Sequence, residues 1–384
     1  MTLHDIAPAL LEDWLRNRYF SARYDISSSG LTPCTLGELR RSLGIDSAEL
    51  DAIPFRDSPS TGSERLRGAI AARYAPGHAD RVMATHGASE SLFLAIAALV
   101  KPGDEIVTLR PVYQSLSSIA EALGARLRTW ELRAEDGFVP DLELLRAVLT
   151  PRTRAVVVNF PHNPTGTTLS RTQYDELLRL VDSHGCHLLW DASFAELAHD
   201  GDPLPEPTGR LERALSFSTL SKAYGLPGLR VGWCVAPPRL IPEMVRLRDY
   251  LTISTSPVAE HLAAVTLEQA DKVLAPHREL AFGNRALLLD WAARNSGRIE
   301  LPTPLGGVTA FPRLVGVPDV TAFCDALEAE DGVLVVPGDC FDHPDRIRVG
   351  FGGSASELSA GLDLLAARVR RMSGVRVPGE QEAV

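Results

Sequence analysis

Lysine is scarce in this 384-residue sequence. Lysine and arginine together number 39, yet only Lys101, Lys222 and Lys272 are lysines. Any reaction that needs a primary amine on a side chain therefore has three candidates. Lys101 lies in a KPGD turn and Lys272 follows an aspartate in a helical stretch, so we expect both to be ordinary surface residues. The setting of Lys222 is different and is described below.

Cysteine is also sparse, and its spacing excludes two classes of protein. The five cysteines are an odd number, are widely spread and form no C-x-x-C pair. This pattern is typical of a reduced, intracellular chain without a disulfide framework or a zinc module. The run His184-Gly-Cys186-His187 imitates a metal site. Because Gly185 predicts the end of a helix, these side chains are expected to diverge, and we expect no metal.

Long apolar runs and an excess of positive charge are both missing. No apolar run approaches the roughly 20 residues that a membrane-spanning helix needs. The net charge of −10 argues against nucleic acid or an anionic membrane as a partner. The first 15 residues hold Glu12 and Asp13 and no basic segment, so no secretory signal is expected. These features predict a cytoplasmic protein without a nucleic-acid or membrane partner.

Two common enzyme motifs are absent as well. No G-x-G-x-x-G follows a first strand, which argues against a nicotinamide cofactor. The run GASES at 87–91 has a serine where the nucleophile elbow of a serine hydrolase needs its last glycine. Neither class is expected.

From about residue 80, short β-branched runs alternate with amphipathic helical stretches. AVVVNF at 155–160 and HLLWD at 187–191 are typical of buried strands, and 171–185 is typical of a helix that ends at a glycine. Such alternation predicts an α/β fold with a mostly parallel central sheet in a large domain, plus a smaller α+β domain. We expect an N-terminal arm and part of the small domain at 1–50, the large ligand-binding domain at 51–285 and the C-terminal small domain at 286–384. The polar tail after about Ser373 is expected to fray.

The residues around Lys222 form the strongest chemical motif. The stretch 218–232 reads STLSKAYGLPGLRVG, so the lysine follows a predicted strand and two hydroxyl residues, and Arg230 lies eight residues further on. A lysine near a fixed cation has a lowered pKa and can act as a nucleophile that forms Schiff bases. Lys222 is therefore the expected catalytic amine.

Other polar residues lie at predicted strand ends, where α/β sheets bind their ligands. Asp191 ends HLLW and needs a buried partner, such as a pyridinium N–H. Asn163 lies in the loop NFPHNPTG, and residues 87–89 open a helix whose free N–H groups suit a phosphate. Tyr113 offers a flat ring. Taken alone, each of these residues can be explained structurally, as a helix cap, a turn residue or a ring in the core. Taken together, they are the parts of a pocket for pyridoxal 5′-phosphate (PLP).

Two signatures point to a family. NPTG at 163–166 and SK-x-x-G-x-x-G-x-R-x-G at 221–232 occur in the order found in fold-type I PLP enzymes, and the chain resembles their class I/II aminotransferase family over nearly its whole length. The resemblance implies that Lys222 binds PLP covalently, that Asp191 pairs with its pyridine nitrogen and that Arg348 grips the substrate α-carboxylate. The other cofactor contacts that it implies are Gly87, Ala88, Ser89, Tyr113, Asn163, Phe194, Thr219, Ser221 and Arg230. Among them, Asn163 would reach the phenolic oxygen and Tyr113 would stack on the ring, while the backbone N–H of Ala88, Ser89, Thr219, Ser221 and Arg230 would surround the phosphate.

Two positions depart from the family pattern. Members commonly carry a tyrosine three residues after the aspartate, where this chain has Phe194, so a hydrogen-bond donor to the cofactor is missing. They often carry another tyrosine, which reaches a phosphate in the partner subunit, where this chain has Asp57. These changes put plain transamination in question but leave covalent binding of PLP intact.

A narrower resemblance rests on blocks outside the cofactor motifs, above all DISSSG at 25–30 and RDYLTIS at 248–254. They resemble PLP-dependent cyclases of peptide-antibiotic biosynthesis that act on 3-hydroxy-L-arginine. The implied reaction is α-proton abstraction, β-elimination of water and intramolecular addition of the guanidine, a lyase-type cyclisation. The alternative is an aminotransferase acting on an amino acid such as arginine, and a PLP-dependent hydroxylase or decarboxylase is a third.

Several roles stay open at this stage. Ser29 and Gly30 are expected to contact the substrate. The guanidinium has Asp25, Glu90 and Ser27 to Ser29 as candidate partners. The proton for the leaving hydroxyl has His86, His162 or a serine of the DISSSG turn as candidate donors. Family resemblance also implies a homodimer.

Overall fold

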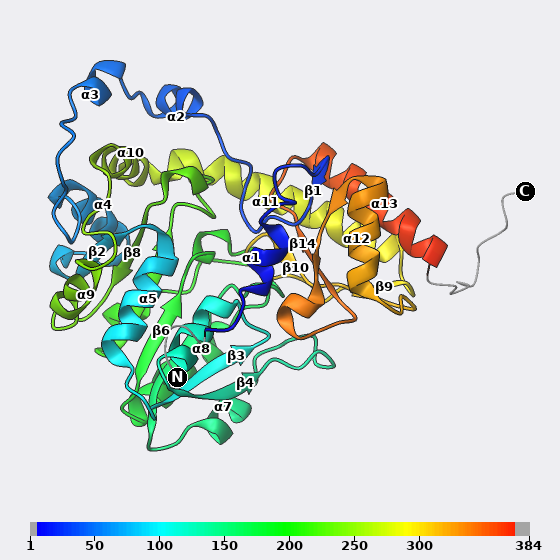
Figure 1. The fold of residues 1–384 in the computed structure, drawn as a ribbon, viewed down its shortest axis with the longest axis horizontal. Helices are drawn as coiled ribbons and strands as arrows, with labels where there is room; N and C mark the ends of the chain where they lie inside the picture. The colour runs from blue at the N-terminus through cyan, green and yellow to red at the C-terminus, as the bar shows by residue number, and fades with distance from the viewer. Residues whose placement is uncertain (1–5, 373–384) are drawn as a thin grey trace, which may run out of the picture.

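A seven-stranded sheet forms the centre of the large domain in the computed structural model, which describes residues 6–372 (Figure 1). The strand order is β2-β8-β7-β6-β5-β3-β4, and β8 alone runs antiparallel to its neighbours. The strands are β2 (Val82–Thr85), β3 (Glu105–Arg110), β4 (Arg126–Glu131), β5 (Thr153–Asn159), β6 (His187–Asp191), β7 (Ala214–Thr219) and β8 (Gly232–Val235). The mostly parallel α/β sheet expected from the sequence is confirmed.

The apolar run of β5 shows why the sheet is buried on both faces. Val156 and Val158 pack in one hydrophobic cluster, while Ala155 and Val157 pack in another on the opposite face. Successive strand residues point to opposite sides, so a strand covered on both faces must be apolar throughout. The helices of this domain are α4 (Glu64–Tyr74), α5 (Gly87–Leu99), α6 (Ser118–Ala122), α7 (Leu142–Val148), α8 (Arg171–Ser183), α9 (Ile241–Arg248) and α10 (Pro257–Glu268).

The small domain combines both ends of the chain. The N-terminal strand β1 (Tyr24–Asp25) pairs in parallel with β12 (Val333–Leu334). Beside them, β14 (Ile347–Gly350) lies between β10 (Thr309–Ala310) and β13 (Val336–Pro337) in antiparallel register, and β9 (Ile299–Glu300) pairs with β11 (Arg313–Leu314). Helices α12 (Val320–Asp331) and α13 (Ala355–Met372) pack on these strands.

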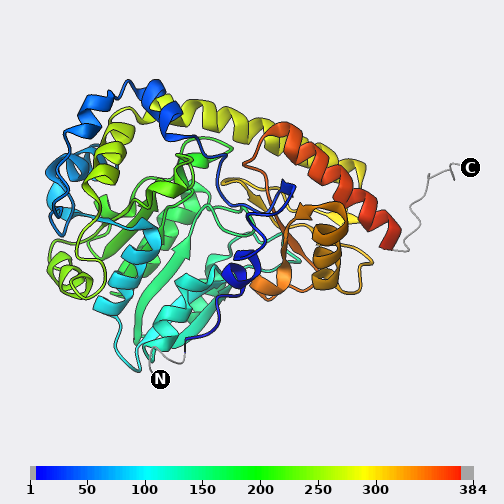
Figure 2. The ribbon, with the colours of Figure 1, turned by 45° about the horizontal axis from the view of Figure 1, so that its top comes forward.

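Long and short helices connect the two regions. The helix α11 (Ala270–Arg294) runs along one edge of the molecule from the large domain to the small one (Figure 2). The expected boundary at 285/286 therefore falls inside a helix. The short helix α1 (Leu10–Leu15) lies between the large sheet and the small domain in both views, and α2 (Leu36–Leu43) and α3 (Ser47–Asp51) follow at the far edge of the large domain.

Within residues 6–372, no helix is long and apolar enough to cross a membrane. The expected fraying of the tail from Ser373 lies outside the described residues. The five cysteines form no disulfide; Cys186 is buried beside the backbone of α8, while the Nδ1 atom of His184 lies 2.8 Å from the carbonyl oxygen of Leu180. In this described part of the chain, no three His, Cys, Asp or Glu side chains are grouped to hold a metal.

Candidate active site

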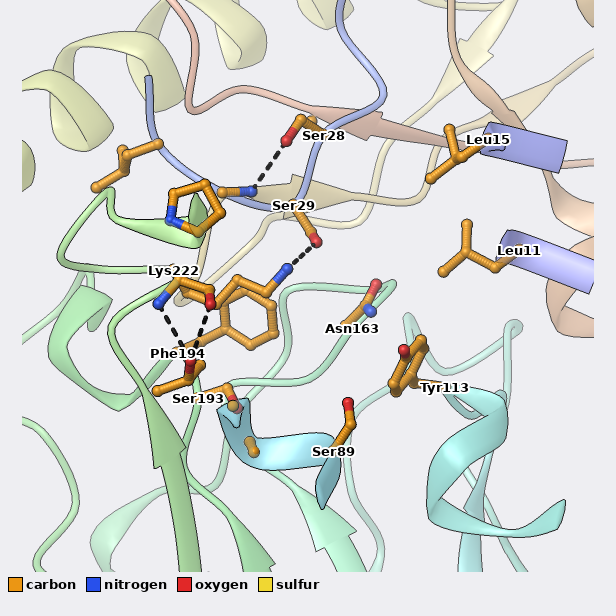
Figure 3. A pocket seen from close by; sticks show the side chains of 18 of the residues that line it. Leu11, Leu15, Ser28, Ser29, Ser89, Tyr113, Asn163, Ser193, Phe194 and Lys222 are labelled. Atoms are coloured by element: carbon orange, nitrogen blue, oxygen red, sulfur yellow. Dashed lines mark hydrogen bonds between the residues drawn. The ribbon is translucent and has the colours of Figure 1, made fainter. Parts of the chain in front are cut away.

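A cavity of about 790 Å³ lies at the carboxyl ends of the central strands. Its walls come from the N-terminal segment, from the loops of the large sheet and from β14 of the small domain (Figure 3). All the site residues expected from the sequence line this cavity: Ser29, Gly30, Gly87, Ala88, Ser89, Tyr113, Asn163, Asp191, Phe194, Thr219, Ser221, Lys222, Arg230 and Arg348.

One end of the cavity has the form of an anion site. Gly87 opens α5 with φ +78°, and a Cβ atom on Gly87 would lie 3.0 Å from the Nη2 atom of Arg230. A Cβ atom on Gly232 would lie 2.6 Å from the backbone nitrogen of Ala88, so β8 approaches the start of α5 as closely as glycine permits. Free N–H groups at a helix start, beside an arginine and the Ser89 hydroxyl, suit a phosphate.

Two further hydroxyls stand beside this end. The Thr219 Oγ1 atom accepts from the backbone N–H of Ser221 and lies 2.9 Å from the Ser221 hydroxyl oxygen. Thr219 ends β7 and Ser221 lies two residues further on, which explains why a short Thr-x-Ser spacing presents two hydroxyls together.

The Lys222 amine reaches the middle of the cavity. Its Nζ atom donates to the Ser29 hydroxyl at 2.7 Å and lies 5.6 Å from the centre of the Phe194 ring. Burial lowers the pKa of Lys222 to about 8, and the positive charge of Arg348 acts in the same direction. A lysine with such a pKa has a substantial neutral fraction near physiological pH, as a nucleophilic amine requires.

Asp191 lies at the end of β6, where its carboxylate faces the cavity floor. One oxygen, Oδ1, accepts from the backbone N–H of Ser193 at 2.9 Å and from its hydroxyl at 2.5 Å. Burial raises the pKa of Asp191 above its usual range, while Ser193 and the charge of Lys222 oppose that shift. A partly buried carboxylate with its second oxygen unpaired among the described residues fits a protonated ring nitrogen.

Arg348 is held rigidly in the opposite wall. Its side chain is 1% exposed, Nη1 donates to the Asn163 Oδ1 atom at 3.2 Å and Nη2 donates to the Ser27 carbonyl at 2.8 Å. The Nε atom has no partner within residues 6–372. Burial lowers the pKa of Arg348 to about 10, so it still carries its charge at neutral pH. A buried, charged guanidinium with a free donor fits a carboxylate.

Aromatic side chains bound the remaining space. The Tyr113 hydroxyl donates to the Glu12 carboxylate at 3.0 Å, and burial, aided by that negative charge, raises the pKa of Tyr113 to about 12. The Phe194 side chain lines the cavity and has no polar atom. It therefore cannot supply the hydrogen bond that a tyrosine at this position would donate to the cofactor.

Four candidates for the open roles lie outside the cavity. His162 is buried with both ring nitrogens in hydrogen bonds, to Thr165 and to the Pro111 carbonyl, and burial lowers its pKa to about 4. Glu90 accepts from the backbone N–H of His86 and from the Thr252 hydroxyl. None of Ser27, His86, Glu90 and His162 lines the cavity. The proton-donor role considered for the two histidines, and the guanidinium contact considered for Ser27 and Glu90, are therefore not supported.

Other residues that line the cavity are not expected from the sequence. Asn159 holds the NPTG loop by accepting from the backbone N–H of Asn163 at 2.8 Å, and Ser193 orients Asp191. Glu12 and Glu357 enter the cavity from α1 and α13. Asn159 ends a predicted strand and was detectable by that position; Glu12 and Glu357 carry no local signal, since their role depends on long-range contacts.

The residues present fit PLP. One cavity holds a partner for each polar group of PLP: the anion site for the phosphate, the unpaired carboxylate oxygen of Asp191 for the ring nitrogen and the amine of Lys222 for the aldehyde. The Nδ2 atom of Asn163 is without a hydrogen bond among the described residues and can donate to the phenolic oxygen.

Comparisons with known proteins agree with this geometry. Residues 54–365 match the family model "Aminotransferase class I and II". The chain is 56% identical over 359 residues to capreomycidine synthase of Streptomyces vinaceus, covering 92% of each chain. It is 31% identical to the arginine–pyruvate transaminase AruH of Pseudomonas aeruginosa over 68% of this chain and 67% of that one. A solved structure of the PLP-dependent cyclase OrfR superposes with a TM-score of 0.91 at 40% identity, covering 95% of this chain and 97% of that one. The chain therefore belongs to the class I and II aminotransferase family, as its sequence signatures predict.

Proposed function

We propose that this protein is a PLP-dependent cyclase of the capreomycidine synthase type. It converts 3-hydroxy-L-arginine to capreomycidine with loss of water, in peptide-antibiotic biosynthesis. The observation that carries the proposal is the 56% identity to capreomycidine synthase across 92% of both chains. The similarity to OrfR, also named a cyclase, supports it.

The chain's own residues supply binding and proton transfer. Arg348 holds the substrate carboxylate and so fixes Cα beside the Lys222 amine. Once freed, Lys222 removes the α-proton, and PLP, when bound, supplies the electron sink for the pair left on Cα. Asp191 keeps the ring nitrogen protonated, which is what makes that sink effective.

The β-hydroxyl leaves as water and needs one proton. The Ser29 hydroxyl lies 2.7 Å from the Lys222 Nζ atom and can pass a proton from the lysine ammonium to the leaving oxygen. A guanidine nitrogen then adds to Cβ and loses a proton, while Cα regains one. Substrate and product therefore differ by one water, and no keto acid is consumed.

The test is product analysis by mass. With 3-hydroxyarginine we expect a product lighter by one water without any keto acid, and with L-arginine we expect no cyclised product. In deuterated water, one deuterium should appear at Cα if the closing proton comes from an exchangeable group.

Transamination is the second candidate, favoured by the 31% identity to an arginine–pyruvate transaminase. Steady amino-group transfer from arginine to pyruvate, together with unchanged 3-hydroxyarginine, would reject the cyclase and establish the aminotransferase. Phe194 argues against this outcome, because the phenol that members commonly place there is absent.

The proposal includes a homodimer acting in the cytoplasm. Large aromatic side chains stand exposed on the single chain, with Phe55 94% and Tyr250 87% exposed, as is typical of interface residues. Light scattering should give twice the 41.6 kDa of the chain. A monomer with full activity would refute the dimer.

A further inference from the structure

The cavity holds more acidic side chains than are needed to bind PLP and the amino and carboxylate groups of an amino acid. Its cationic residues have partners or roles already: Lys222, Arg230 and Arg348 serve the cofactor and carboxylate, and Arg16 lies 2.8 Å from the Asp13 carboxylate. Of the acidic residues, Asp191 serves the ring nitrogen. Glu12, Asp25 and Glu357 remain.

The buried Arg348 determines which part of a substrate meets these carboxylates. Its charged guanidinium lines the cavity and marks the carboxylate end, and Lys222 marks the amine end. With both ends of the amino-acid group fixed, the side chain extends into the remaining part of the cavity, which the N-terminal segment and the start of α13 enclose.

Glu12 and Asp25 are placed to meet that side chain. Glu12 Oε1 accepts from the Tyr113 hydroxyl, and its Oε2 atom has no hydrogen bond within the described residues. Asp25 Oδ1 accepts from the Ser27 backbone N–H at 2.9 Å and hydroxyl at 2.6 Å, which leaves Oδ2 similarly unpaired. In each carboxylate, one oxygen is held by hydrogen bonds and the other is free to accept a hydrogen bond from the substrate.

Both carboxylates lie in the same cavity as Arg348 and act on its charge. The negative charges of Glu12 and Asp25 act to raise the pKa of Arg348, against the lowering caused by burial. The charge of Glu12 acts in the same way on the pKa of Lys222. Glu357 has a different contact, because its Oε1 atom accepts from the backbone N–H of Asp25 at 3.3 Å and so helps to position Asp25.

We infer that Glu12 and Asp25 form the specificity site of this enzyme, where their free carboxylate oxygens bind the guanidinium of the substrate. This inference rests on the proposed function, since it names the group that recognises an arginine-type side chain. Two carboxylates from the N-terminal segment bind the far end of the side chain, while β14 holds the near end through Arg348. A neutral side chain of the same length leaves both carboxylates without a counter-charge, which costs binding free energy.

The test measures binding to the PLP-loaded enzyme, with L-arginine and L-citrulline as ligands of equal length that lack the 3-hydroxyl. Dissociation constants come from calorimetry, and the absorbance of the bound cofactor checks that each variant is loaded. We expect the unaltered enzyme to prefer arginine by roughly 100-fold, on the order of tenfold for each charged hydrogen bond. Glu12→Gln and Asp25→Asn should each weaken arginine binding about tenfold and leave citrulline binding unchanged.

Asp51→Asn is the control. It removes one negative charge from an exposed position in the N-terminal segment, and Asp51 does not line the cavity. Arginine affinity should stay the same in this variant, and an equal loss would overturn the inference by showing that net charge alone matters. Glu12 is exposed, so Glu12→Gln should fold even if Asp25→Asn does not.

The two proposals fail in different ways. If the unaltered enzyme prefers arginine and the Glu12 and Asp25 variants keep that preference, the specificity site is wrong and the arginine-type substrate stands. If the unaltered enzyme binds citrulline as tightly as arginine, both the site and the proposed substrate class are wrong.

Discussion

Burial and one neighbouring charge adapt the Lys222 amine to its task. Because its pKa is lowered to about 8, the neutral amine should predominate above that pH rather than above the ordinary value near 10.5. Covalent capture of PLP by the cofactor-free protein should therefore quicken as pH rises from 6.5 and level off above about 8. Borohydride trapping at a series of pH values measures this, with the label expected on Lys222.

Arg348→Gln provides the matched variant for that measurement. Removing the positive charge that helps to lower the Lys222 pKa should move the midpoint of capture to higher pH. Lys101→Ala and Lys272→Ala should leave the profile unchanged, because Lys101 lies in an exposed turn and Lys272 bonds only to Gln269. A label on either of these lysines would contradict the assignment of Lys222.

At the scale of elements, the anion site depends on how closely β8 meets the start of α5. A Cβ atom on Gly232 would lie 2.5 Å from the carbonyl carbon of Gly87, so Gly232→Ala must push the two elements apart. We expect a loss of about 1–3 kcal/mol in the free energy of unfolding and weaker PLP binding, measured by denaturant titration and by cofactor release. Gly228→Ala is the control, since nothing lies within 4 Å of a Cβ there; equal effects of both changes would refute the argument from contact.

At the scale of the whole molecule, one buried carboxylate joins distant parts of the chain. Glu196 accepts from Arg73 of α4 at 2.6 Å, from Arg278 of α11 at 2.6 Å and from the Tyr74 hydroxyl at 2.9 Å. Glu196→Gln should cost about 3 kcal/mol in the free energy of unfolding, because it leaves two arginines facing a neutral group. Glu268→Gln, which breaks an exposed pair with Arg65, should cost under about 1 kcal/mol.

The same network has a pH dependence of known sign. Burial acts to raise the pKa of Glu196, but its hydrogen bond to Arg73 and the nearby charges outweigh it, so the pKa is lowered. The stabilisation is therefore fully present above the unfolded-state value near 4.5 and is lost as pH falls through the folded-state value. Denaturant titrations between pH 7 and pH 4 should show a smaller decline for Glu196→Gln than for the unaltered protein; parallel curves would contradict this.

The amino-acid sequence by itself determined the family, the fold class and the cofactor pocket. Lys222, Arg230 and Asn163 belong to short motifs, and the position of Asp191 follows from the run that β6 buries, so local patterns were enough to find them. These predictions work because parallel strands bring their carboxyl ends to one edge, so that separate motifs meet without any knowledge of packing.

Only the tertiary structure decided which other groups face the substrate. The Ser29 hydroxyl meets Lys222 across 193 positions of sequence, and Glu12 meets Tyr113 across 101. The same long-range packing buries His162 with both nitrogens occupied and pairs Glu90 with Thr252, away from the cavity. Periodicity reports how a residue lies on its own helix or strand, whereas these contacts depend on how β1 pairs with β12 and where α1 then lies, which no local pattern encodes.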